Sequence, residues 1–238
     1  MAYPLKTLGT GEFMTQIIRR FAGMVCHHLF EEFLMLFPRF LTTSAAVILT
    51  TASLMTALLV HDASAATVDV AGVKLEETVN LRGSPVVLNG AGVRYKAVFQ
   101  VYVAALYLEK KVNTPEEVGS LAGKKRVAVT MLRDIDANEL GKLFIKGIAD
   151  NAPKAEFSKL IPGLTKTGEI FAAIKKLNAG DEFTIDYVPG VGTSFWVKGV
   201  QLMTAVTEPE YFNAVIRIWL GPSPADWKLK DAMLGKPS

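Results

Sequence analysis

The sequence predicts an α+β fold in which helices pack on an antiparallel sheet. After residue 66 the expected elements come as strands, then helices, then strands, then helices, rather than as alternating β-α-β units. One strand, residues 98–109, is apolar on both faces, so a second layer must cover each face. No repeat or Pro/Gly linker interrupts residues 66–238, which favours one domain with one core.

The first 65 residues differ in character from the rest. Arg39 precedes an uncharged run, residues 41–60, and Ala63-Ser64-Ala65 follows as a small-x-small cleavage site. We expect an upstream extension without assigned fold over 1–34 and a signal peptide over 35–65. Cleavage near Ala65 would leave a periplasmic or otherwise exported protein. The alternative is an uncleaved inner-membrane anchor at 41–60, although its many Thr and Ser residues make it a weak one.

The part of the chain after residue 65 has no cysteine and no histidine, and this excludes several classes of function. The only cysteine, Cys26, and the histidines His27, His28 and His61 all precede residue 66. A disulfide framework, a Ser-His-Asp triad, a cysteine nucleophile and a zinc site of His or Cys are therefore excluded after it. We expect no metal and no cofactor. The net charge of +3 and the short cluster Lys124-Lys125-Arg126, interpreted as a solvated face, do not suggest nucleic-acid binding.

The first strands alternate with turn signals. Residues 67–75 predict a short strand pair broken at Ala71-Gly72, and residues 85–88 predict a strand that runs into a turn at Asn89-Gly90-Ala91-Gly92. Residues 93–96 predict the next strand. It is followed by the doubly apolar strand 98–109 and then by a strand over 126–132.

The helices and the last strands follow. Asp136 and Glu139 resemble a capping box, and Leu140, Leu143, Phe144 and Ile148 form an apolar stripe behind them. A second helix is expected from about Thr165 to Leu177, ended by Gly180. Residues 181–188 and 193–198 predict a hairpin. Two closing helices are expected after Thr207-Glu208-Pro209 and after Ser223-Pro224-Ala225-Asp226, the second ending at Gly235.

Arg94 and Tyr102 are the candidate site residues. Arg94 enters an apolar hairpin, where a buried guanidinium needs a partner such as a bound carboxylate. Tyr102 lies eight residues on, and a chain reversal between them would place it opposite Arg94. A buried phenol also seeks a polar partner. The simpler interpretation, still open from sequence alone, is a surface-paired arginine and a core tyrosine bonded to backbone.

Two segments resemble the chalcone isomerase-like family. They are Gly90-Ala91-Gly92-Val93-Arg94 and the run 101–109 (VYVAALYLE), continued by Val129-Thr130-Met131 and by residues 213–221 (NAVIRIWLG). The resemblance covers most of residues 67–235. It implies an open-faced β-sandwich with helices packed over one face.

This family has catalytic and non-catalytic members. Its isomerases cyclise chalcones with an arginine, a threonine, a tyrosine and an asparagine, whereas other members bind fatty acids through the arginine and a tyrosine. By resemblance the arginine is Arg94, and the threonine position is Tyr102. The catalytic tyrosine and asparagine positions fall at Leu140 and Gly147. Asn138 and Asn151 are the alternates if the alignment of this helix is shifted by about a turn. The polar catalytic set has therefore changed, while the arginine and tyrosine of the lipid-binding members are kept.

We therefore expect a non-catalytic binder of a fatty acid or similar small apolar acid, held by Arg94 and Tyr102. Membrane contact is expected only through the signal segment, and only if that segment stays uncleaved. Two alternatives stay open. One is a chalcone-flavanone isomerase type of intramolecular lyase, and the other is a structural or partner-binding protein without a ligand.

Overall fold

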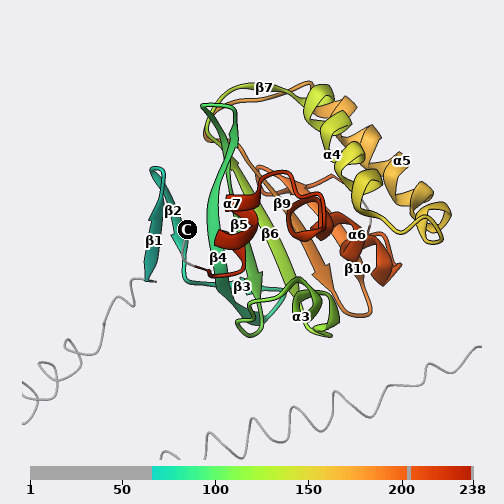
Figure 1. Ribbon diagram of the computed structural model, residues 1–238, viewed down its shortest axis with the longest axis horizontal. Helices are drawn as coiled ribbons and strands as arrows, with labels where there is room; N and C mark the ends of the chain where they lie inside the picture. Colours follow the sequence, from blue (N-terminus) through green and yellow to red (C-terminus); the bar gives the residue numbers. More distant parts are fainter. Residues whose placement is uncertain (1–65, 203–204, 237–238) are drawn as a thin grey trace, which may run out of the picture. The chain divides into compact units, whose positions relative to one another are not determined.

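A seven-stranded antiparallel sheet forms the centre of the computed structural model, which describes residues 66–202 and 205–236 (Figure 1). Its strand order is β11-β10-β9-β6-β5-β4-β3. The strands are β3 (Thr78–Leu81), β4 (Ser84–Lys96), β5 (Phe99–Leu108), β6 (Lys125–Met131), β9 (Glu182–Val188), β10 (Gly192–Val197) and β11 (Val200–Gln201). Short pairs join β1 (Thr67–Val70) to β2 (Val73–Glu76) and β7 (Ile135–Asp136) to β8 (Lys176–Leu177).

Helices cover one face of this sheet (Figure 1). Phe144 joins the layers, because its ring lies 5.6 Å from that of Phe171, 5.7 Å from Phe195 of β10 and 6.1 Å from Trp219. The predicted α+β fold with helices on an antiparallel sheet is confirmed. The helices are α3 (Pro115–Ser120), α4 (Ala137–Asn151), α5 (Phe157–Ile174), α6 (Pro209–Leu220) and α7 (Trp227–Met233).

β5 is buried on both faces, as its composition predicts. Ala104, Leu106 and Leu108 join the core cluster beneath the helices. Val103, Ala105 and Tyr107 join a second cluster, which the curled sheet and the β1–β2 hairpin complete on the opposite face. Both clusters are built from residues between Leu75 and Leu234, and the described residues from Ala66 onward belong to one compact unit with its own core.

The predicted turn at residues 89–92 is wrong, because these residues lie inside β4. Asn89 is a buried amide at a bulge, where it donates to Met233 O (2.8 Å) and accepts from Val112 N (2.8 Å). Gly90 is required by packing rather than by a turn, since a Cβ there would lie 2.1 Å from Ala232 O of α7. The chain reverses further on, at Ala97 and Val98.

The second predicted helix differs at both ends. α5 begins at Phe157 rather than near Thr165, and it includes Pro162-Gly163, a pair that normally indicates a helix break. Gly163 makes room for the ring of Tyr211, which a Cβ would approach to 2.3 Å. α5 ends at Ile174 because Lys175 takes a positive φ of 64° and the chain continues as β8.

Other local predictions were partly wrong. The strand β3 and the helix α3 were not anticipated, and α6 already begins at Pro209, with Glu208 as its N-cap. The expected solvated face at Lys124–Arg126 is also wrong, because Lys125 is only 2 % exposed and Arg126 forms a bidentate pair with Asp186, at 2.6 and 2.7 Å.

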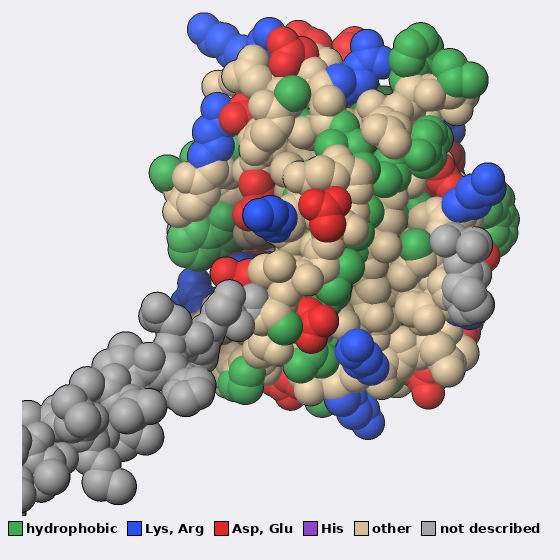
Figure 2. Space-filling model, turned by 90° about the vertical axis from the view of Figure 1, so that its left-hand side faces the viewer, with side chains coloured by type: hydrophobic (Ala, Val, Ile, Leu, Met, Phe, Trp, Pro, Cys, Tyr) green, Lys and Arg blue, Asp and Glu red, His purple; other side chains and the backbone are tan. Residues whose placement is uncertain are grey.

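The predicted upstream extension (1–34), signal peptide (35–65) and alternative anchor (41–60) lie outside the described residues. Within residues 66–202 and 205–236, no helix is both long and apolar enough to cross a bilayer. Charged side chains of both signs are scattered over the face shown in Figure 2, without a basic stripe on that face.

Candidate functional site: a cleft between the sheet and helices α4 and α6

A cleft of about 240 Å³ lies on the helix-covered face of the sheet. Strands β4 and β5 form its floor, α4 and α6 form its walls, and residues 223–225 close one side. Most of the lining is apolar. Its charged groups are Arg94 and Lys96 on the β4 side and, on the α4 side, Lys146 and Asp150, which pair with each other at 2.6 Å. Its lining includes Arg94, Lys96, Val101, Tyr102, Leu140, Leu143, Phe144, Gly147, Ile218, Trp219 and Pro224.

Arg94 and Tyr102 are cross-strand partners in the β4–β5 ladder. Directly opposed residues of an antiparallel pair present their side chains on the same face. The Arg94 guanidinium carbon lies 5.9 Å from the centre of the Tyr102 ring, and both residues line the cleft. The predicted opposition of the two residues is therefore seen, although the reversal that creates it occurs at Ala97 and Val98.

Tyr102 is held by a hydrogen bond from α6. The Trp219 Nε1–H donates to the Tyr102 hydroxyl oxygen at 3.0 Å, and Tyr102 is only 5 % exposed. Burial raises the pKa of Tyr102 to about 12, more than the nearby Arg94 lowers it, so the phenol stays protonated at physiological pH. Because its oxygen already accepts from Trp219, and no acceptor for its proton occurs among the described residues, the hydroxyl is left as a donor to a ligand.

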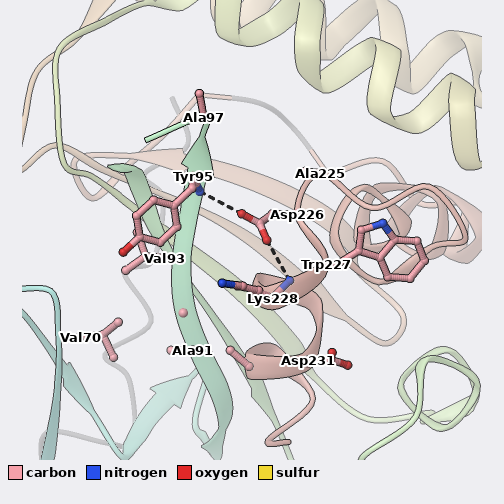
Figure 3. A pocket seen from close by; sticks show the side chains of 12 residues that line it. Val70, Ala91, Val93, Tyr95, Ala97, Ala225, Asp226, Trp227, Lys228 and Asp231 are labelled. Atoms are coloured by element: carbon pink, nitrogen blue, oxygen red, sulfur yellow. Dashed lines mark hydrogen bonds between the residues drawn. The ribbon is translucent and has the colours of Figure 1, made fainter. Parts of the chain in front are cut away.

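Arg94 is half-buried and forms no hydrogen bond or ion pair with any residue of the described part of the chain. The nearby carboxylate of Asp226 is already occupied: it accepts from Tyr95 N at 3.0 Å and from Lys228 N at 2.9 Å, bonds that Figure 3 shows beside β4. The surface-paired interpretation of Arg94 therefore finds no acidic partner within these residues.

Two cleft positions that would carry polar groups in an isomerase offer none here. Leu140 and Gly147 both line the cleft from α4, as the alignment by resemblance placed them. Gly147 also lets α4 approach α6, because a Cβ there would lie 3.2 Å from Ile218 Cγ2. Leu143, expected to face inward with the rest of the stripe, is instead 45 % exposed at the edge of the cleft.

The alternates Asn138 and Asn151 do not reach the cleft. Asn138 is exposed at the start of α4 and is absent from the lining. Asn151 is fully engaged at the end of α4, where Nδ2 donates to Gly147 O (2.8 Å) and Ser223 O (2.9 Å), and Oδ1 accepts from Ser223 N (2.8 Å). Its amide secures the loop after α6 and has no group left for a substrate.

Sequence reasoning missed the role of Trp219 in this site. Trp219 belongs to the apolar stripe of α6 and is 2 % exposed. The stripe shows which side of the helix is inward, but it carries no information about which strand residue the indole meets. Among the described residues, no group of three or more His, Cys, Asp or Glu side chains is placed to hold a metal ion.

The sequence and the fold were both compared with those of known proteins. The sequence model of a family described as chalcone isomerase-like matches residues 66–235. The crystal structure of the fatty-acid binding protein AtFAP1 from Arabidopsis thaliana superposes with a TM-score of 0.56 at 15 % sequence identity, covering 71 % of this chain and 96 % of that chain. This similarity shows a shared fold. No curated protein matches the sequence.

Proposed function

The chain belongs to the chalcone isomerase-like family, and from that premise we propose that it is a non-catalytic, exported binder of a fatty acid or a similar apolar carboxylic acid. One observation carries the proposal: the guanidinium of Arg94, without an acidic partner in the described residues, stands beside a phenol donor at the end of an apolar cleft. The shared fold with a protein named for fatty-acid binding supports it.

The carboxylate would be held by two kinds of donor. Arg94 offers the planar fork that matches a carboxylate bidentately, and Tyr102 adds its hydroxyl proton, which the hydrogen bond from Trp219 orients. The tail would lie against Phe144 and its apolar neighbours. The cleft volume of about 240 Å³ lies below the roughly 300–1,000 Å³ usual for ligand pockets, so a long tail would extend past Leu143 at the edge.

The isomerase alternative is weaker because of Leu140 and Gly147. Each lost hydrogen-bonding group costs about 2–4 kcal/mol of transition-state stabilisation, and neither Asn138 nor Asn151 replaces one. We therefore expect chalcone cyclisation close to the uncatalysed rate. A turnover within about tenfold of a true isomerase, equivalent to about 1.4 kcal/mol, would restore the enzymatic interpretation.

Lipid extraction tests the proposal on the protein as cells make it. The chain from Ala66 onward would be purified without detergent and its bound lipids identified by mass spectrometry, next to those of Arg94→Ala. We expect an apolar carboxylic acid in the wild-type extract and much less in the variant. An extract without any such acid, together with no binding of added fatty acid, would favour the partner-binding alternative instead.

A further inference from the structure

The tip of the β4–β5 hairpin is apolar where turns are usually polar. Lys96 pairs with Phe99, so Ala97 and Val98 form a two-residue turn. Such turns favour Asn, Asp or Gly, yet here Ala97 takes a φ of 55° and Val98 follows it. Val98 is 82 % exposed and Phe99 is 59 % exposed, which places two large apolar side chains in water at a projecting point.

Cations surround this tip. The Arg133 guanidinium carbon lies 5.3 Å from the centre of the Phe99 ring, and Lys96 is exposed beside it. Neither cation has an ion pair with a residue of the described ranges. The neighbouring carboxylate of Asp134 is paired with Lys176 at 2.6 Å, and that of Asp136 accepts from Glu139 N at the start of α4. The tip therefore combines exposed apolar groups with uncompensated positive charge.

From this combination we infer that the hairpin tip docks on the surface of an anionic phospholipid bilayer. Val98 and Phe99 would enter the headgroup region, while Lys96 and Arg133 would meet the lipid phosphates. A bilayer fits the tip better than a protein partner does, because a stable protein interface buries about 800 Å² on each side, whereas this apolar surface is a convex point of a few side chains.

The position of the tip connects this surface to the cleft. Lys96 lines the cleft, and Arg94 lies two residues before it on the same strand. Docking would therefore bring the carboxylate-binding end of the cleft close to the lipids from which an apolar acid is taken or to which it is delivered. In this respect the inference rests on the proposed function, although vesicle binding can be measured without any fatty acid.

Vesicle co-sedimentation tests the inference with the chain from Ala66 to Ser238. We expect it to pellet with vesicles that contain phosphatidylglycerol, much less with pure phosphatidylcholine, and less at high salt. Val98→Asp should weaken binding to the anionic vesicles by about tenfold, through lost insertion and an added negative charge. Arg133→Gln should weaken it by a smaller factor.

The matched control is Ile161→Asp, which adds the same charge at a residue 52 % exposed on α5. Ile161 lies near the start of α5, just beyond the end of α4, whereas the tip contacts Arg133 ahead of the start of α4. This control should bind vesicles like the wild type. Absence of wild-type binding to anionic vesicles, equal binding by Val98→Asp, or equal losses in Val98→Asp and Ile161→Asp would each contradict the inference.

Fatty-acid titration without vesicles separates this inference from the proposed function. Val98 and Phe99 do not line the cleft, so Val98→Asp should bind a soluble fluorescent fatty acid as the wild type does. Vesicle binding without fatty-acid binding would overturn the proposed function and leave the docking surface standing. Fatty-acid binding without vesicle binding would overturn only the docking surface.

Discussion

At the scale of single residues, the cleft depends on a division of roles between three side chains. Trp219 donates to Tyr102, Tyr102 keeps its proton because burial raises its pKa to about 12, and Arg94 supplies the charge. At this position an apolar acid entering as its anion would meet donors, while the one carboxylate among the described lining residues, that of Asp150, is paired with Lys146. This arrangement favours a carboxylate over a neutral ketone, which has no negative charge to offset the desolvation of Arg94.

The buried side chain of Lys125 should make the free energy of unfolding depend on pH. Lys125 is 2 % exposed, its ammonium lies 5.4 Å from the Tyr187 ring centre, and burial lowers its pKa from 10.5 to about 8. Between these two pKa values the unfolded chain binds the proton and the folded chain does not, so the free energy of unfolding should rise with pH. The full shift amounts to about 3 kcal/mol.

Urea denaturation from pH 7 to about pH 9.5 measures this effect. Tyrosines begin to ionise in the unfolded chain near the upper end of this range, but they do so equally in the wild type and in the comparison variant. Lys125→Met is the comparison, because methionine fills similar space without the charge. The wild type should gain about 2 kcal/mol more than the variant over this range. Parallel pH profiles for the two proteins would show that Lys125 does not retain a lowered pKa in solution.

At the scale of elements, α7 and β4 are fitted to each other. Gly90 and Gly92 leave space on β4, into which Ala232 and Leu229 of α7 pack. Asp226 caps α7 through Lys228 N and also accepts from Tyr95 N, so it ties the start of the helix to the strand that carries Arg94 (Figure 3). The glycines of the family-like segment thus set how closely α7 packs on the strand that carries Arg94.

Gly90→Ala tests this fit. Its Cβ would lie 2.1 Å from the backbone oxygen of Ala232, so α7 must move, and we expect a loss of about 1–3 kcal/mol in the free energy of unfolding, or more. Gly119→Ala in α3 is the control, because a Cβ there meets open space and alanine favours a helix by up to about 1 kcal/mol. Similar urea midpoints for both variants would argue against close packing of α7 on β4.

The same elements show what sequence patterns can and cannot predict. Apolar runs correctly located β5, β6, β9 and β10, because burial on one or both faces leaves a period in the residues. Asn89-Gly90 was misinterpreted because a turn signal and a bulge packed under a helix use the same residues. The pairing of Arg94 with Tyr102 was anticipated, whereas the hydrogen bond from Trp219 depends on a contact between residues 117 positions apart.

At the scale of the whole molecule, the proposed export concerns residues outside the described part of the chain. The uncharged run 41–60 and Ala63-Ser64-Ala65 motivate it. Expressed in a bacterial host, the full chain should yield a periplasmic protein whose N-terminus, read by mass spectrometry, is at or near Ala66. Full-length protein retained in the membrane fraction would instead support the anchor.

The proposed ligand depends on one feature of the molecule: Arg94, which has no acidic partner among the described residues, lines a mostly apolar cleft. Titration with a fluorescent fatty acid tests this most directly, using the wild type, Arg94→Ala, Arg94→Lys and Tyr102→Phe after each is shown to be folded. We expect Arg94→Ala to weaken binding by about tenfold or more, since a charge-assisted hydrogen bond contributes about 1.5–3 kcal/mol. Arg94→Lys should recover part of the loss, and Tyr102→Phe should cost less than Arg94→Ala. Unchanged affinity in Arg94→Ala would contradict the account and identify Arg94 as an ordinary half-buried residue.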